Sequence, residues 1–432
     1  MLLHTARSTR DAASETRSYP AVIALCMVIT VIEGFNLIVY GSVVPMLLAD
    51  ASLGVTDEQT GLIGGLVYIG AIIGSVAAPT LADRIGRKRV LVVAISVFAA
   101  GAILTGCSVS ALMLALARTV TGLGIGASLT TAMTVARNSA AAARASLALT
   151  VTMAGIPLGG VMAALLAVPI LPAFGWRPMF FVGAGTGLII LVTVVFMAIP
   201  TDTPQELAGR LCSTREKLAI LFTGRGLVVT AIVAGCAIAN MVSWQGLNVW
   251  AAQAMVDLGF TLRTALLMTF VLTASAVAGS FLTAWAADRR GPAVVGIATA
   301  GSTFVGLAGL LTLPASLVTV VGCVALMGIG GHSTMNLIHA TTADIYPLPA
   351  RASALGWSNG TSFVGSFTGP VVGGTAIATG GAHGLFEVFG AAAAVCFLSV
   401  SALYVADRRG RRQPTAGTDQ SANSDTVAIA FR

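Results

Sequence analysis

The chain has 432 residues, of which 56% are hydrophobic and only 9% are charged, and its mean hydropathy is +0.90. This balance excludes an ordinary soluble domain, which would expose too much apolar surface, and it predicts a protein that crosses a membrane several times. The net charge of +7 does not indicate nucleic-acid binding, because the arginines and lysines cluster in short segments between apolar stretches.

Hydropathy predicts an all-α membrane protein with twelve transmembrane helices, each long enough to cross a hydrocarbon core of about 30 Å. We expect the first span to be retained, since it is too long for a cleaved signal peptide. The expected spans are 20–48, 60–82, 90–110, 112–136, 145–170, 178–199, 226–252, 264–287, 292–314, 316–341, 352–378 and 384–406.

The positive charges predict the orientation. If the N-terminus is inside, 21 of the 24 lysines and arginines are cytoplasmic, only Arg177 and Arg263 lie outside, and Arg118 falls within a span. We therefore expect a multi-pass protein of the cytoplasmic (plasma) membrane, monomeric, with both termini in the cytoplasm. Residues 1–19 form the expected cytoplasmic N-terminal segment, and 407–432 form an expected disordered cytoplasmic tail.

The sequence repeats itself. The pattern that starts at Gly74 recurs at Gly279, an offset of 205 residues, and Arg144-Ala145-Ser146 recurs at Arg351, an offset of 207 residues. The repeat predicts two six-helix halves, 20–199 and 226–406, joined by a cytoplasmic loop at 200–225. Parallel repeats of this kind are typical of transporters that bind their substrate between the halves near the middle of the membrane.

The repeated segments are expected to form a gate. A glycine in the helix permits close helix contact, and a glycine in the turn permits a tight reversal beside charged side chains. The alternative is a solvated charged loop that only fixes the topology. The gating residues are Gly74, Asp83, Arg84, Gly86, Arg87, Lys88, Gly279, Asp288, Arg289 and Gly291.

Glu33 is a carboxylate deep inside the first span, where a charge costs about 2.5–3.5 kcal/mol on insertion scales. Helical spacing places Asn36 and Tyr40 on its face, which suits a wet cavity with proton handling and substrate binding. The alternative is a polar stripe buried for packing. Arg118 in the fourth span also needs a partner, and we expect Glu33 to be that partner in a pair that switches on protonation. A structural ion pair, or an arginine that snorkels to the outer interface, is the alternative.

Further candidate substrate-binding residues lie in later spans. His332, Asn336 and His339 form one polar face of the tenth span, and they could relay protons or bind a carboxylate, or they could be hydrogen-bonded core residues. Histidines spaced in this way do not predict a metal site. The aromatic and amide candidates, which could equally be interfacial anchors, are Trp244, Gln245, Asn248 and Trp357.

No cofactor is expected. Neither lysine, Lys88 or Lys217, follows a phosphate-binding glycine loop, so an ion gradient is the expected energy source rather than a nucleotide. The sequence shows no nucleophile–base set and no metal cluster, so we do not expect an enzyme. The six cysteines show no paired spacing typical of a disulfide framework.

The pattern from Gly74 to Lys88 resembles the signature of the major facilitator superfamily, over nearly the whole chain. Glu33-Gly34-Phe35-Asn36, with Gly41 and Pro45, resembles the first-span signature of its aromatic acid:proton symporters. Four positions differ from that family. Glu33 replaces an aspartate but keeps the acid, Asn36 replaces a second aspartate and loses it, Phe363 stands where the family has an arginine, and Thr130 where it has a proline. Other similar segments are Arg118 with 121–126, 175–177, 247–250, 346–357 and 365–374.

The resemblance implies proton-coupled symport that imports a small organic anion, an aromatic carboxylate of the benzoate, hydroxybenzoate or gentisate type. Co-transported protons would neutralise an anion that must cross a negative-inside potential worth about 2.3 kcal/mol per 100 mV. Proton-driven efflux of amphipathic compounds is the alternative, because Gly155, Pro157, Gly159 and Gly160 resemble part of an antiporter element. Symport of another small organic acid, or a receptor that binds without turnover, are further alternatives.

Overall fold

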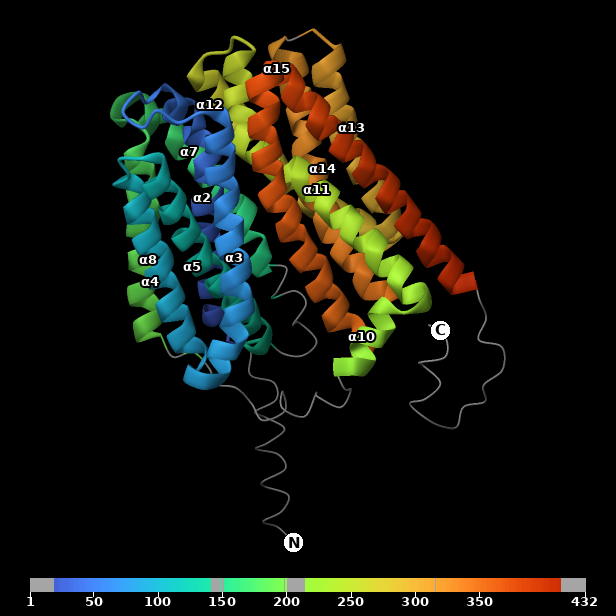
Figure 1. Ribbon diagram of the computed structural model, residues 1–432. Helices are drawn as coiled ribbons and strands as arrows, with labels where there is room; N and C mark the ends of the chain where they lie inside the picture. Colours follow the sequence, from blue (N-terminus) through green and yellow to red (C-terminus); the bar gives the residue numbers. More distant parts are fainter. Residues whose placement is uncertain are drawn as a thin grey trace, which may run out of the picture. The chain divides into compact units, whose positions relative to one another are not determined.

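The computed structural model describes residues 19–140, 148, 151–197, 199, 214–314 and 316–412. Most of the expected N-terminal segment, the first part of the expected central loop and most of the expected tail lie outside these residues. The described chain is helical throughout apart from short connections, and it falls into two compact units (Figure 1).

The first unit contains the helices up to α8, except for the start of α3, which up to Gly65 groups with the second unit. Its helices are α2 (Pro20–Ala49), α3 (Asp57–Ile85), α4 (Arg87–Gly106), α5 (Ala111–Asn138), α7 (Gly155–Phe174) and α8 (Arg177–Phe196).

The second unit contains the remaining helices. The last of them, α15, bends at Gly381, whose φ of 58° and ψ of −151° are not helical, so it consists of two helices in sequence. The helices are α10 (Thr214–Phe222), α11 (Gly224–Asp257), α12 (Leu262–Arg290), α13 (Pro292–Thr312), α14 (Leu317–Ile345) and α15 (Leu348–Arg412).

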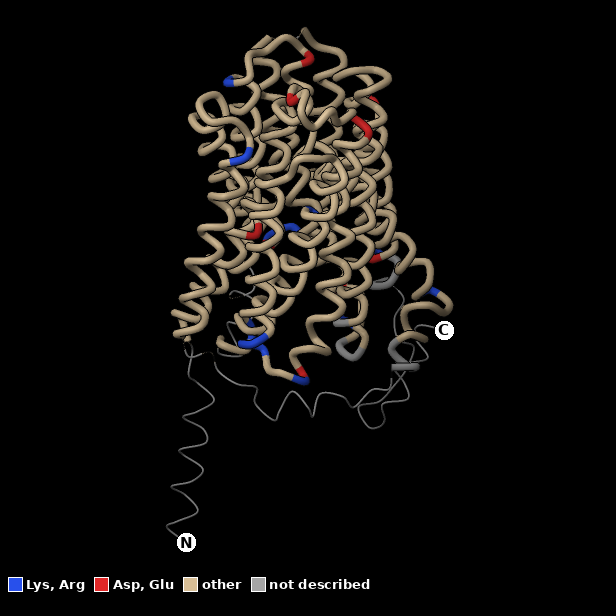
Figure 2. Tube along the Cα trace, turned by 60° about the vertical axis from the view of Figure 1, so that its left-hand side comes forward, with Lys and Arg blue, Asp and Glu red and all other residues tan. Residues whose placement is uncertain are grey.

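Eleven of the described helices are long and apolar enough to cross a membrane. The last of these candidates, Ser353–Arg408, contains the bend at Gly381 and therefore accounts for both of the last two expected spans. The prediction of an all-α membrane protein with twelve spans is confirmed. Many charged residues lie toward the ends of the helices, and a few lie between them, in otherwise uncharged stretches (Figure 2).

Glycines bring helices of the first unit into backbone contact. A Cβ at Gly74 of α3 would lie 2.9 Å from the backbone nitrogen of Ala127 in α5, and a Cβ at Gly126 would meet the backbone of Ala71 in the opposite direction. In the second unit a Cβ at Gly279 of α12 would lie 2.8 Å from Cα of Ile329 in α14. Because lipid tails are as apolar as side chains, such close packing is what holds membrane helices together.

The backbone of the repeated segment is the same in both units. Gly86, between α3 and α4, has φ 88° and ψ 147°, and Gly291, between α12 and α13, has φ 86° and ψ 146°. A side chain is strained at such positive φ values, which explains a glycine at both turns.

The expected boundaries differ from the structure by a few residues at several helices, and two differences lie in the second unit. Thr214–Phe222 forms the short helix α10 inside the segment expected to be a loop. Charged residues in its first turn led to the loop prediction, but Leu221 is buried against the rest of the unit and fixes the helix there. The seventh span is also longer than the expected 226–252, since α11 runs from Gly224 to Asp257.

Candidate functional site

Glu33 lies in the middle of α2 and is completely buried. One carboxyl oxygen, Oε1, is hydrogen-bonded to the hydroxyl of Ser128 in α5. The same hydroxyl lies 2.9 Å from the carbonyl oxygen of Gly124, one turn earlier in α5. Sequence analysis did not identify Ser128; a hydroxyl within an apolar helix that neighbours the Glu33 helix was the available signal.

The second oxygen of Glu33, Oε2, has no hydrogen-bond partner. The expected ion pair with Arg118 is not formed, so that prediction is wrong for this conformation. Among the described residues, no cation lies within ion-pair distance of Glu33. The carboxyl group is thus buried with one hydrogen-bond partner and no compensating charge.

Arg118 is buried in the second turn of α5, at 1% exposure. Its Nη1 donates to the backbone carbonyl oxygen of Asn36 at 3.0 Å, and its guanidinium carbon lies 4.9 Å from the ring centre of Tyr40. Its Nε–H has no acceptor. The guanidinium is therefore held by a carbonyl and an aromatic face, and no carboxylate among the described residues neutralises it.

The helix axes explain why the two charges stay apart. Ser128 is ten residues after Arg118, which is about 15 Å along α5 at 1.5 Å per residue. Ser128 meets α2 at Glu33, whereas Arg118 meets it at Asn36 and Tyr40, nearer the other end. The two helices α2 and α5 are neighbours, as expected, but Glu33 and Arg118 lie at different depths along them.

The side chain of Asn36 packs against α8. Its Nδ2 donates to the backbone oxygen of Ile32 at 2.9 Å, and a Cβ at Gly183 of α8 would lie 2.5 Å from its Oδ1. The amide is thus wedged between α2 and α8, and its Oδ1 has no hydrogen-bond partner. The role of Asn36 as a substrate contact stays a prediction.

In the second unit, the structure brings two of the expected residues together. The rings of Trp244 in α11 and His332 in α14 are 5.9 Å apart with an interplanar angle of 52°. Trp244 is buried over Gly331, where any side chain would collide with its ring. Asn240, which sequence analysis missed, donates to the carbonyl oxygen of Gly331 at 3.0 Å and ties the same helices together.

Two buried polar atoms on the helices of this pair lack partners among the described residues. Asn248 donates to the carbonyl oxygen of Trp244 at 2.7 Å, but its Oδ1 is buried without a donor. His339, two turns after His332 in α14, has an unpartnered Nε2, whereas Asn336 between them is exposed. Gln245 is half-buried next to Trp244.

Trp357 lies elsewhere in the unit. Its indole Nε1 donates to the carbonyl oxygen of Thr230 at 3.2 Å, and its ring packs edge-on against Phe222 of α10 at 5.1 Å. Thr230 is fourteen residues before Trp244, about 21 Å along α11. Trp357 therefore fixes α10 to α15 and does not join the group around Trp244.

The turn between α3 and α4 is anchored by Lys88. Its ammonium group donates to the carbonyl oxygens of Val195 and Met197, at 2.8 and 3.0 Å, where α8 ends. A lysine at a helix C-terminus satisfies carbonyls that lack intrahelical partners.

Other expected gating residues lie at the surface. Asp83 and Asp288 are both exposed, and Arg289 stacks on the ring of Trp285 at 3.9 Å.

Asp50, just beyond the end of α2, forms a cluster that sequence analysis missed. It accepts hydrogen bonds from the indole of Trp176 at 3.0 Å and from Arg177 at 3.3 Å, and Arg177 also donates to the carbonyl oxygen of Ser108. Hydrogen bonds from Ser52 and Trp176 lower the pKa of Asp50 to about 2. The expected orientation would put this cluster on the outer side of the membrane, and we call Asp50, Ser108, Trp176 and Arg177 the outer clasp.

Comparison with known proteins relates this architecture to a family. The family model described as Major Facilitator Superfamily matches residues 26–324 and 233–431. A gentisate transporter of Corynebacterium glutamicum is 30% identical over 390 residues, which cover 89% of this chain and 87% of the relative. A benzoate transport protein of Acinetobacter baylyi is 24% identical, and the match covers 94% of each protein.

A solved structure supports the fold. The chain superimposes with a TM-score of 0.72 on a bacterial homologue of the human lysosomal transporter Spinster in an inward-facing, unoccupied conformation. The match covers 90% of this chain and 97% of that protein, at 17% identity.

Proposed function

Because the chain belongs to the major facilitator superfamily and is a membrane transporter rather than an enzyme, we propose that it imports a small aromatic carboxylate together with protons. Import occurs by alternating access across the cytoplasmic membrane, with both chain termini on the cytoplasmic side. Glu33 carries the coupling proton, and Arg118 meets the carboxylate of the substrate.

The observation that carries this proposal is the environment of Glu33. An ionised carboxylate buried without a cation is costly, so the geometry fits a protonated acid with Ser128 as its single partner. The unpartnered Oε2 can take up or release a proton when water reaches it. If this position served only for packing, a neutral side chain would fill it at a lower cost of burial than a carboxyl group.

Arg118 supplies the complementary charge. Its guanidinium has one N–H on a backbone carbonyl and an Nε–H without an acceptor, so donors remain for an anion. Guanidinium groups bind carboxylates through paired, charge-assisted hydrogen bonds. A carboxylate substrate would therefore satisfy a buried cation that has no acidic partner among the described side chains.

The second unit has aromatic surfaces of its own. Trp244 and His332 offer ring surfaces 5.9 Å apart, and Asn248 and His339 have buried polar atoms without partners. Aromatic rings prefer offset or edge-on contacts with such surfaces. The gentisate and benzoate that name two relatives each combine one ring with one carboxylate, which supports this substrate class.

Uptake into cells tests the proposal. Radiolabelled gentisate and benzoate are offered to cells that express the wild type, Glu33→Gln or Glu387→Gln, with and without a protonophore. We expect the protonophore and Glu33→Gln each to reduce uptake at least tenfold. Glu387→Gln, the same change at an exposed acid of α15, should leave uptake at the wild-type level.

Two results contradict the proposal in different ways. Uptake that survives both Glu33→Gln and the protonophore would remove Glu33 as the coupling site. If the substrate instead leaves preloaded cells when a proton gradient is imposed, the protein exports the substrate and does not import it.

A further inference from the structure

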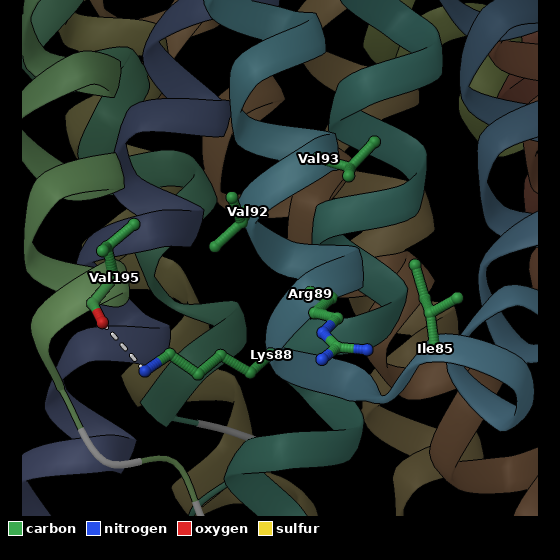
Figure 3. A pocket seen from close by; sticks show the side chains of 6 residues that line it. All are labelled: Ile85, Lys88, Arg89, Val92, Val93 and Val195. Atoms are coloured by element: carbon green, nitrogen blue, oxygen red, sulfur yellow. Dashed lines mark hydrogen bonds between the residues drawn. The ribbon is translucent and has the colours of Figure 1, made fainter.

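A groove opens on the first unit where α4 begins and α8 ends. Its volume is about 460 Å³, and it is open along one side. Figure 3 shows Lys88 and Arg89 at one end of the groove and Val92 and Val93 toward the other, with Val195 of α8 as the facing wall. Ile85, at the end of α3, completes the lining.

The polar end of this groove is strongly basic. Lys88 uses two hydrogen bonds to reach the end of α8, so one of its three N–H groups remains for another acceptor. Arg89 is exposed and has no hydrogen-bond or ion-pair partner among the described residues. The first turn of α4 contains no acidic residue and no side-chain cap, so nothing in that turn offsets the positive end of the helix.

The other end and the facing wall are apolar and exposed. Val93 is 47% exposed and Val195 is 45% exposed, although both lie in helices that cross the membrane. Hydrocarbon chains cover such side chains in a bilayer. The groove thus has the two parts of a lipid-binding site, with cations at the depth of the headgroups and valines at the depth of the acyl chains.

We propose that this groove binds one anionic phospholipid of the cytoplasmic leaflet. The lipid phosphate lies against Lys88 and Arg89, and one acyl chain lies along Val92, Val93 and Val195. Basic pockets between membrane helices on the cytoplasmic side are suited to anionic headgroups. Because Lys88 also anchors the turn between α3 and α4, the bound lipid stabilises that turn against α8.

Native mass spectrometry of the full-length protein in detergent tests the site, with phosphatidylglycerol and phosphatidylethanolamine of the same acyl chains. Three variants are compared with the wild type. Arg89→Gln removes a cation from the groove without breaking a hydrogen bond. Arg137→Gln removes an equally exposed cation at the end of α5, outside the groove. Val93→Trp fills the apolar end and leaves the charges in place.

We expect the first phosphatidylglycerol to bind at least fivefold more tightly than phosphatidylethanolamine. Arg89→Gln should weaken phosphatidylglycerol binding about fivefold, as expected for loss of one basic contact with an anionic lipid, while Arg137→Gln changes nothing. Val93→Trp should weaken both lipids. Excess inorganic phosphate should not displace the lipid, because it cannot occupy the apolar end.

Equal binding of the two lipids by the wild type would overturn the proposal, since the groove would then be an unspecific part of the lipid shell. Equal effects of Arg89→Gln and Arg137→Gln would do the same, because the loss would reflect total charge. Displacement by inorganic phosphate would identify a site for free anions instead of a lipid. Normal thermal unfolding of each variant confirms that a loss of binding is not a loss of fold.

Discussion

Among the described residues, the hydroxyl of Ser128 is the only hydrogen-bond partner of Glu33, so the acid depends on one side chain of a neighbouring helix. Ser128→Ala leaves both carboxyl oxygens without partners. A buried polar group that loses its partner costs about 1–3 kcal/mol, so we expect Ser128→Ala to reduce the unfolding free energy by that amount. Ser128→Thr keeps the hydroxyl and should cost less.

A double-mutant cycle in detergent measures this dependence. Ser128→Ala, Glu33→Leu and the double variant are unfolded under the same conditions, and the two single effects should fail to add by about 1 kcal/mol or more, because leucine cannot accept the Ser128 hydrogen bond. Ser401→Ala is the matched control, because that half-buried hydroxyl bonds only to Phe397 of its own helix, at 2.7 Å. Additive effects at positions 33 and 128 would show that the two side chains do not interact in the folded protein.

Gly183 provides a second test at the level of single residues. A Cβ at this position would lie 2.5 Å from Oδ1 of Asn36, so Gly183→Ala must displace an amide that is already bonded to Ile32. Such overpacking costs about 1–3 kcal/mol. We expect a lower unfolding temperature for Gly183→Ala, and recovery in the double variant with Asn36→Ala.

Gly185, two residues later in α8, is the control for this substitution. A Cβ there meets nothing within 4 Å, so alanine should stabilise the helix slightly, by up to about 1 kcal/mol. If Gly183→Ala and Gly185→Ala have the same effect, Asn36 does not lie against α8.

At the scale of whole elements, the outer clasp connects α2 to the start of α8 and to the end of α4. Asp50 joins them through Trp176 and Arg177, and its pKa is lowered to about 2, mainly by hydrogen bonds from Ser52 and Trp176. A carboxyl whose pKa is depressed by folding stabilises the folded state at a pH above its unfolded value, near 3.9. This contribution is lost as the pH falls through 2.

We therefore expect the wild type to lose unfolding free energy between pH 4 and pH 2 more steeply than Asp50→Asn, which cannot ionise there. At neutral pH the variant should be less stable by about 0.5–1 kcal/mol, because the clasp is partly exposed to solvent. Thermal unfolding in detergent over this pH range is the measurement. Glu387→Gln should keep the wild-type dependence, and a parallel loss in wild type and Asp50→Asn would exclude the clasp as its origin.

Hydropathy and charge predicted the helices well because a membrane segment must satisfy its own backbone hydrogen bonds, which leaves helices as the only spanning choice here. The short helix α10 was missed because it lies outside the spans and depends on packing of Leu221 and Phe222. The candidate site was predicted less well. Glu33 and Arg118 were identified by the cost of burial, but their partners depend on helix depth and rotation, which hydropathy does not encode.

At the scale of the whole molecule, the orientation proposed from the positive charges can be tested with a natural cysteine. Cys107 follows the last residue of α4 and is exposed, whereas Cys26, Cys236, Cys323 and Cys396 are buried. With the N-terminus inside, α2 runs outward, α3 inward and α4 outward again. Cys107 is then on the outer side of the membrane.

A membrane-impermeant maleimide should therefore label the protein in intact spheroplasts. Cys212 lies in the expected cytoplasmic loop, outside the described residues, so the experiment uses Cys212→Ser as the parent and adds Cys107→Ser as the control. Labelling should be lost with Cys107→Ser and should be much weaker in sealed inverted vesicles. Labelling confined to inverted vesicles would reverse the orientation, and it would place the basic groove of α4 and the gating turn at Gly86 on the outer side, against both proposals.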